Sequence, residues 1–333
     1  MRLGVFNELD QWADYLWNQC DGALGRHGDM QLVRWGRDAD RVFVMNWPSP
    51  PGGARRAIGW RRHLWKLFRK PTAPLRARYG YRWLAREPGD VDVMLYEPPE
   101  IIPEWLMALS KQHAARVFAP DARATHPVAL PAMWTVPYGV KMLASIAPRT
   151  IEKPVGVVAI SSGAPPGKSL IAGHHARLNF YERLHRAGVG LELFGRGLPA
   201  RTGGRGPVQD KSSVLWPARL ALVIENSAGG SCGGRYVTEK LWDALACWCL
   251  PVYFGSAAAD AMIPPEAMVR LPDLGERGVE TLREALADEG LWARRLEAIA
   301  EARRRMLGEL RLVEWLARNV VGRSVVGRSV VGR

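Results

Sequence analysis

Cysteine is scarce in this sequence, and long hydrophobic runs are absent. Four cysteines occur among 333 residues, and Cys247 and Cys249 share one apolar segment. This distribution does not resemble a disulfide framework and is typical of a reducing compartment. The first residues, MRLGVFNELDQW, have neither the hydrophobic core nor the cleavage site of a signal peptide, and no stretch reaches the length of a membrane span. We therefore expect a cytoplasmic protein.

Patterns for metal binding and for nucleoside triphosphate hydrolysis are also missing. The seven histidines include one adjacent pair, His174 and His175, and show no zinc-ligand spacing. The Asp-x-Asp triplets at 38–40 and 90–92 precede strand candidates instead of ending them, so we interpret them as polar loop residues. The segment SSGAPPGKS resembles a P-loop, but Ser162 stands where that pattern needs glycine. Its two prolines also lack the N–H groups that cradle a phosphate.

Acidic residues are missing from one long stretch of the chain. The formal net charge is +13, and residues 54–86 carry eleven Lys or Arg and no Asp or Glu. Within this stretch, 58–70 has helical spacing with aromatic and basic faces, so we expect peripheral contact with an anionic membrane at the inner face. Packing of this helix on its own domain, with a solvated basic face, is an alternative. Binding of single-stranded nucleic acid is a third, which the absence of any nucleic-acid motif disfavours.

A buried strand followed by a glycine-rich loop is the most informative feature present. Residues 220–224 form an apolar run suited to a parallel sheet, and Glu225 and Asn226 come directly after it. Open α/β sheets bind ligands at the carboxyl ends of their strands. The loop at 228–234 contains four glycines, which allow close backbone approach.

This loop leads into a predicted helix with charged residues in its first turn. Thr238 is the expected N-cap, and Glu239 and Lys240 follow it. The free N–H groups of a helix N-terminus attract anions. Lys240 adds a positive charge and Tyr236 a hydroxyl at the same place. The junction therefore predicts a site for an anionic ligand.

Two further strand-to-helix regions precede this one. Residues 155–162 are a strand candidate, followed by the helical segment ARLNFYERLHRAG and a strand that begins at Leu191. In the front half, strand candidates at 41–45 and 91–96 precede Glu97-Pro98-Pro99-Glu100 and a helix over 103–113. Length and composition predict two α/β domains of about 150 residues each.

The motifs resemble a known family. Glu-Asn-Ser, a short loop, then YVTEKLWDAL and PVYFGS resemble the donor-site signature of glycosyltransferase family 10, the α-1,3/1,4-fucosyltransferases. Ile224 stands where that family usually has an aromatic residue, and the glycine-rich insert is longer than usual. The resemblance implies an α/β GT-B fold, in which two Rossmann-like domains face a central cleft. It also implies a bacterial-type soluble enzyme that transfers L-fucose from GDP-fucose with inversion.

The resemblance assigns roles to residues that match the family's motifs. Glu97 is the expected general base, with Glu100 and Glu104 as alternatives. A leaving nucleoside diphosphate needs positive charge nearby, which fixed cations can supply without a metal or other cofactor. The expected donor-binding residues are Arg177 and Lys240 at the diphosphate, Tyr236 and Glu239 at the ribose and nucleotide end, and Glu225 and Asn226 at the sugar. Val237 and Thr238 are also expected to bind the donor.

The domain plan and the acceptor complete these expectations. We expect an acceptor-side domain at 1–150, a donor domain at 151–290, a C-terminal helix at 291–318 and a loose VVGRS-repeat tail at 319–333, with a linker near 146–153. The expected acceptor is a glycan such as a lipopolysaccharide O-antigen, at O3 or O4 of GlcNAc or Glc. A related transferase with another nucleotide sugar, and a non-catalytic glycan- or membrane-binding protein, are the alternatives.

Overall fold

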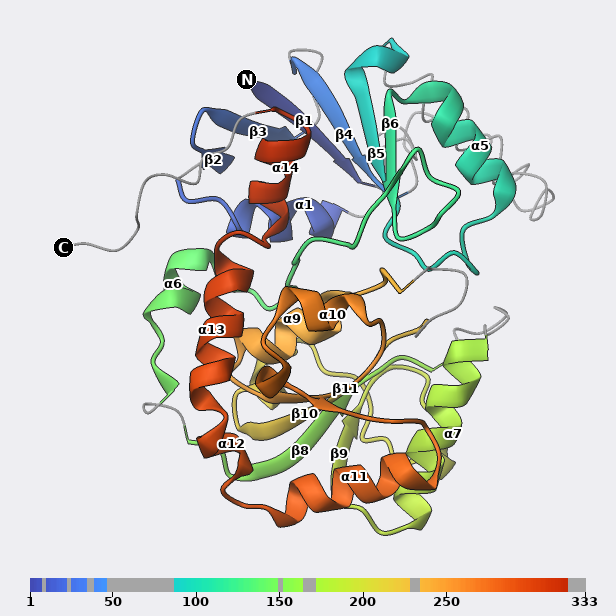
Figure 1. The fold of residues 1–333 in the computed structure, drawn as a ribbon, viewed down its shortest axis with the longest axis vertical. Helices are drawn as coiled ribbons and strands as arrows, with labels where there is room; N and C mark the ends of the chain where they lie inside the picture. Colours follow the sequence, from blue (N-terminus) through green and yellow to red (C-terminus); the bar gives the residue numbers. More distant parts are fainter. Residues whose placement is uncertain are drawn as a thin grey trace, which may run out of the picture. The chain divides into compact units, whose positions relative to one another are not determined.

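The computed structural model describes residues 1–7, 10–22, 25–34, 39–46, 87–148, 152–163, 172–227 and 234–322 (Figure 1). The chain divides into two compact units, Met1–Val128 with Leu316–Arg333, and Ala129–Trp315. The predicted linker at 146–153 lies inside the second unit. The basic stretch at 54–86 and most of the VVGRS repeats lie outside the described residues, so the expected membrane contact and loose tail stay predictions.

The first unit contains a seven-stranded sheet. Its strand order is β2-β3-β1-β4-β5-β6-β7, with β2 antiparallel to β3 and the other pairs parallel. The strands are β1 (Arg2–Asn7), β2 (Arg26–His27), β3 (Met30–Arg34), β4 (Arg41–Met45), β5 (Val91–Met94), β6 (Arg116–Ala119) and β7 (His126–Pro127). The helices are α1 (Asp10–Asn18) and α5 (Glu104–His113). The strand predicted at 41–45 is confirmed, and the one predicted at 91–96 ends two residues earlier.

A buried carboxylate joins the central strands of this unit. Asp92 lies inside β5 with no exposed side-chain surface, so the interpretation of 90–92 as loop residues is wrong at this position. Its oxygens accept hydrogen bonds from Arg41 Nη2 at 3.0 Å and from Arg116 Nε at 2.8 Å. Arg116 also donates to the carbonyl oxygens of Asn319 and Val320. These contacts fasten the last described residues of the chain to the first unit.

The second unit contains a five-stranded parallel sheet. The strands are β8 (Val155–Ile160), β9 (Leu191–Phe194), β10 (Ala218–Ile224), β11 (Leu250–Phe254) and β12 (Val269–Arg270). Their spatial order is β12-β11-β10-β8-β9. Strand β9 lies on one side of β8 in the sheet, and β10, which comes next in the sequence, lies on the other side of β8. The strand order therefore reverses between β8 and β10, and such a switch point is where open α/β sheets bind ligands.

The helices of the second unit cover this sheet. They are α6 (Val140–Ser145), α7 (Ala172–Arg186), α8 (Ser212–Leu215), α9 (Glu239–Ala246), α10 (Ala258–Met262), α11 (Glu276–Ala287), α12 (Leu291–Arg294) and α13 (Leu296–Leu307). Helix α9 packs on β10 and β11, as Figure 1 shows, and buries Leu241, Trp242 and Leu245 completely. Their helical spacing forms an apolar stripe that faces the sheet. Helix α7 contributes Phe180 and Leu184 to the same core.

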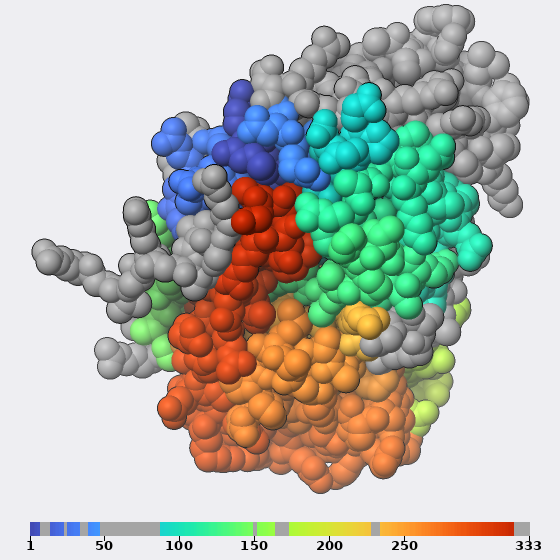
Figure 2. All heavy atoms as spheres, turned by 45° about the horizontal axis from the view of Figure 1, so that its top comes forward, coloured from blue at the N-terminus to red at the C-terminus, as the bar shows by residue number. Residues whose placement is uncertain are grey.

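The C-terminal segment is three helices instead of the single helix expected at 291–318. Helix α13 ends at Leu307 before Gly308, and α14 (Leu312–Asn319) follows a short break. In this break Arg311 forms a parallel bridge with Ala132, whose N–H donates to Leu310 O at 2.7 Å. An extended residue cannot stay in a helix, so this pairing interrupts it. Helices α12 and α13 lie on the face of the second unit seen in Figure 2.

No helix in the described ranges is long and apolar enough to cross a membrane.

Candidate functional site

Arg177 spans the two strand ends at the switch point of the second unit. It lies in the second turn of α7 and is 1% exposed. Its Nη2 donates to Ser162 O, just after β8, at 2.9 Å, and its Nη1 donates to Asn226 Oδ1, just after β10, at 2.5 Å. The fold therefore brings Arg177 and Asn226 together. The guanidinium lies at the place where the topology predicts a ligand.

Arg177 has no direct carboxylate partner among the residues that the structure describes. Within the same part of the chain, its Nε also has no hydrogen-bond partner. A buried cation is costly to desolvate unless an anion compensates it, and a buried donor without an acceptor costs free energy as well. The site thus has the electrostatic character of an anion-binding site.

The start of α7 lies unusually close to the end of β10. A Cβ added to Gly173 would lie 1.8 Å from the carbonyl oxygen of Asn226. Only glycine allows the two backbones to approach this closely. The approach places the first turn of α7 directly beside Asn226, and His174 and Arg177 with it.

Glu225 fixes the start of α9. Its side chain has no exposed surface, and its oxygens accept hydrogen bonds from Thr238 N at 2.8 Å and Thr238 Oγ1 at 2.6 Å. Thr238 caps the helix by accepting a hydrogen bond from the Lys240 N–H. The prediction of Thr238 as the N-cap is confirmed. Glu225 was expected at the sugar, but its described contacts make it a buried support for the cap.

Lys240 and its neighbours form a chain of alternating charges. Lys240 Nζ lies 3.0 Å from Thr238 Oγ1, 3.4 Å from Glu239 Oε1 and 3.5 Å from Glu225 Oε2. Lys211 Nζ lies 2.8 Å from Asp243 Oδ2 and 4.0 Å from Glu239 Oε1. Lys240 therefore shares its charge with two carboxylates, in contrast to Arg177.

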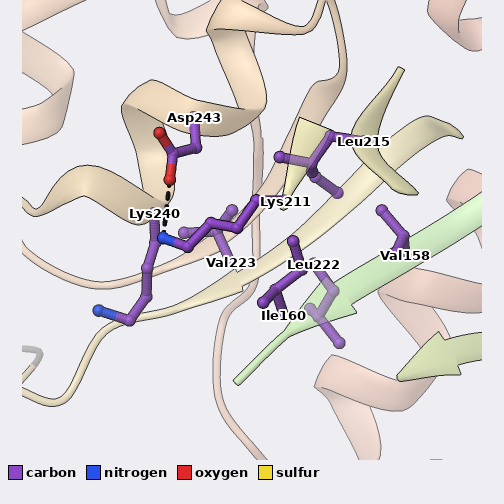
Figure 3. A pocket seen from close by; sticks show the side chains of 9 residues that line it. Val158, Ile160, Lys211, Leu215, Leu222, Val223, Lys240 and Asp243 are labelled. Atoms are coloured by element: carbon purple, nitrogen blue, oxygen red, sulfur yellow. Dashed lines mark hydrogen bonds and ion pairs between the residues drawn. The ribbon is translucent and has the colours of Figure 1, made fainter. Parts of the chain in front are cut away.

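Lys211 and Asp243 are residues that the sequence did not single out. Asp243 is buried in α9 and also accepts hydrogen bonds from Thr135 N, Thr135 Oγ1 and Val136 N. Figure 3 shows Lys211 reaching Asp243 beside Lys240, with apolar strand residues on the other side. These groups line a cavity of about 30 Å³, which has room for one or two waters. It is far too small for a nucleotide sugar.

The buried charges shift one another's pKa values. Burial acts to raise the pKa of Glu239, but Lys240, Lys211 and a backbone hydrogen bond outweigh it and lower the value to about 2. Burial raises the pKa of Glu225, and the Lys240 charge offsets part of that rise. Burial acts to lower the pKa of Lys240, but Glu239 and Glu225 outweigh it and raise the value. Glu239 and Lys240 are thus held in their charged forms.

The remaining donor-site candidates lie on the approach to α9. Tyr236 is 3% exposed and Val237 is fully buried, so both belong to the packed interior next to the cap. The glycine-rich loop at 228–233 that precedes them lies outside the described residues. Among the residues that are described, no group of three or more His, Cys, Asp or Glu side chains is placed to hold a metal ion.

Glu97 lies in the first unit, three residues after the end of β5, and is half-buried. The turn that carries it is fixed by Arg123, which the sequence did not point to. Arg123 Nη2 donates to Pro99 O and Ile102 O, each at 3.0 Å, and the guanidinium pairs with Asp121. A hydrogen bond from Arg123 to Asp121 is the main cause that raises the pKa of Arg123.

Of the alternative bases, Glu100 is exposed, and the Glu104 side chain is 89% exposed.

One protein family matches the part of the chain that contains these residues. The family described as "Glycosyltransferase family 10 (fucosyltransferase) C-term" matches residues 168–287. Residues 168–287 carry a glycosyltransferase family 10 domain. The matched segment contains Arg177, Glu225 and the start of α9, and the resemblance deduced from the sequence is confirmed. The chain is accordingly a glycosyltransferase. No match was found among curated proteins.

Solved structures support the fold of this glycosyltransferase. Anabaena HepE in complex with UDP and glucose is 11% identical, with 96% of this chain and 98% of that chain covered and a TM-score of 0.52. A T4 phage BGT mutant in complex with UDP-glucose is 12% identical, with 93% and 96% covered and a TM-score of 0.51. An α1,3-fucosyltransferase with GDP is 13% identical over 89% and 81%, with a TM-score of 0.49. The predicted GT-B fold with two Rossmann-like units is confirmed.

The lowered pKa of Glu239 predicts an acid-sensitive contribution to stability. The carboxylate is charged in the folded protein down to about pH 2, whereas its ordinary value is 4.5. Stability from this group is therefore fully present above pH 4.5 and is lost as the pH falls toward 2. We expect Glu239→Gln to lower the free energy of urea unfolding at pH 6, and the difference from the wild type to shrink between pH 4.5 and 2.

The matched control is Glu280→Gln, since the Glu280 side chain on α11 is 62% exposed. It should show no such pH-dependent difference. A gap between wild type and Glu239→Gln that stays constant down to pH 2 would contradict the assignment of a strongly lowered pKa.

Proposed function

We propose that this chain is an inverting fucosyltransferase that moves L-fucose from GDP-fucose to a glycan hydroxyl. The expected acceptor is O3 or O4 of GlcNAc or Glc in a glycan such as a lipopolysaccharide O-antigen. The observation that carries the proposal is the buried, uncompensated guanidinium of Arg177 at the switch point of a family 10 domain. The two phosphates of a nucleotide sugar are the anion that such a guanidinium lacks.

The donor would lie across the ends of β8 and β10. Arginine binds phosphate oxygens with two parallel hydrogen bonds. Arg177 Nε is a buried donor that has no acceptor among the described residues. The N-termini of α7 and α9 begin at this region, and the positive ends of their dipoles lie there. Lys240 adds a charge that Glu239 and Glu225 hold in its protonated form.

These groups would also stabilise the leaving nucleoside diphosphate without a metal. Negative charge grows on the diphosphate as its bond to the sugar C1 breaks, and preorganised cations stabilise that charge without reorganising. Arg177 and Lys240, together with the two helix N-termini, are the groups proposed for this role.

Glu97 is the proposed general base. In an inverting transfer, one carboxylate takes the proton from the acceptor hydroxyl as its oxygen attacks C1 from the face opposite the leaving group. Glu97 follows a buried strand on a turn that Arg123 holds through two carbonyl oxygens. A rigid turn keeps the carboxylate in one orientation, which general-base catalysis needs.

A nucleotide panel tests the donor. We expect GDP-fucose to raise the midpoint of thermal unfolding in the presence of EDTA, more than GDP-mannose, UDP-glucose or CMP-sialic acid. A ligand at about 100 times its Kd stabilises the folded state by about 2.7 kcal/mol, which is readily measured by a dye-based melt. Arg177→Leu should abolish this stabilisation because it removes the diphosphate partner.

The control for this variant is Arg186→Ala on the same helix, since the Arg186 side chain is 78% exposed. It should respond like the wild type. Stabilisation by a UDP-sugar but not by GDP-fucose would identify a related transferase. Glycan binding without any response to nucleotides would favour the non-catalytic alternative and overturn the proposal.

A second test concerns the base. We expect Glu97→Gln to lower kcat by roughly a hundredfold to ten-thousandfold, the usual contribution of a general base, with little change in donor affinity. A coupled assay of GDP release in the presence of acceptor measures this loss. Glu104→Gln is the matched control, because its carboxylate is exposed in the next helix. Full activity of a folded Glu97→Gln variant, or a comparable loss in Glu104→Gln, would remove the assignment.

A further inference from the structure

His174 occupies the first turn of α7, next to the groups proposed to hold the donor. Its ring is half-buried, and its Nδ1 is buried without a hydrogen-bond partner in the described part of the chain. Arg177, one turn later in the same helix, carries the second such nitrogen, its Nε. Two buried nitrogens without partners at one switch point indicate that a ligand atom completes this site.

Among the described residues, the charged groups that shift the pKa of His174 are all positive. His175 and Arg177 come from its own helix, and Lys240 comes from the first turn of α9. Asn226, which follows β10, contributes a hydrogen bond to the ring. Burial is the largest cause that lowers the pKa of His174, and the charges of Arg177, Lys240 and His175 lower it further, to about 4. The imidazole is therefore neutral at physiological pH while no anion is bound.

A diphosphate bound at Arg177 and Lys240 changes this balance. Its negative charges offset the cations that keep the ring neutral, and its oxygens accept hydrogen bonds from an imidazolium. Both effects favour the protonated ring. By linkage, a ligand that raises the proton affinity of a group binds more tightly as the pH falls.

We propose that His174 is a further donor-site residue, which at mildly acidic pH takes up a proton from solvent when a nucleotide sugar binds and contacts its diphosphate as an imidazolium. The bound proton adds a third cation beside Arg177 and Lys240 and leaves the site again with the product nucleotide. The assignment rests on the proposed donor site and extends it to a residue that couples donor binding to pH.

Calorimetric titration of the full chain with GDP-fucose tests this coupling. Sugar nucleotides carry two phosphates whose protons are lost well below pH 5, so the ligand itself takes up no proton in the range used. Titrations at pH 5.5 and 7.5, each in two buffers of different ionisation enthalpy, give the number of protons bound with the ligand. We expect close to one proton at pH 5.5 and almost none at pH 7.5.

The affinity should change in parallel. If binding restores the ordinary histidine value of about 6.5, GDP-fucose binds about tenfold more tightly at pH 5.5 than at pH 7.5. His174→Gln should lose both the proton uptake and the pH dependence of Kd. His185→Gln is the matched control, because His185 is exposed in the last turn of the same helix and is not among the groups that shift the pKa of His174, and it should behave like the wild type. A merely structural role for His174 would lower affinity equally at both pH values.

Each outcome decides one claim. Binding of GDP-fucose by the wild type at pH 5.5 without proton uptake overturns the inference and leaves the proposed donor in place, whether or not the variant folds. Equal proton uptake in His174→Gln and the wild type overturns it as well. No binding of GDP-fucose to the wild type at either pH overturns the proposed donor, and the inference with it.

Discussion

A buried guanidinium without a carboxylate partner is the constraint on which the second unit depends. Arg177 joins the residues after β8 to those after β10, at the one place where the strand order reverses. Two nitrogens of the Arg177 guanidinium, Nη1 and Nη2, donate hydrogen bonds to the protein, and Nε has no partner among the described residues. The folded state therefore retains a buried positive charge that a bound anion can neutralise.

The other charges of this region serve the geometry of α9 instead. Glu225, Glu239 and Asp243 form ion pairs with Lys240 and Lys211, and Thr238 connects Glu225 to the helix cap. Such a network is costly to break at any member because each removal leaves another charge buried without its partner. It holds the N-terminus of α9 in one orientation, which is what a preorganised anion site requires.

The parts of the fold that depend on local sequence were predictable. The strand at 41–45, the cap at Thr238 and the apolar stripe of α9 follow from residues within a few positions of one another. Long-range partners were not predictable. Asp92 is buried because Arg41 and Arg116, at separations of 51 and 24 residues, neutralise it. The C-terminal helix is interrupted because Arg311 pairs with Ala132. The unpartnered nitrogen of His174 likewise exists only after α7 packs beside β10.

Hydrogen exchange of the full chain, with and without saturating GDP-fucose, tests the central claim most directly. The account predicts slower exchange at the backbone amides of 161–163, the first turn of α7, 225–227 and the first turn of α9, because a diphosphate at Arg177 contacts these segments together. Helices α11 and α13 should exchange unchanged. Protection that is absent from the switch point, or that is confined to other segments, would contradict the assignment of the donor site to the ends of β8 and β10.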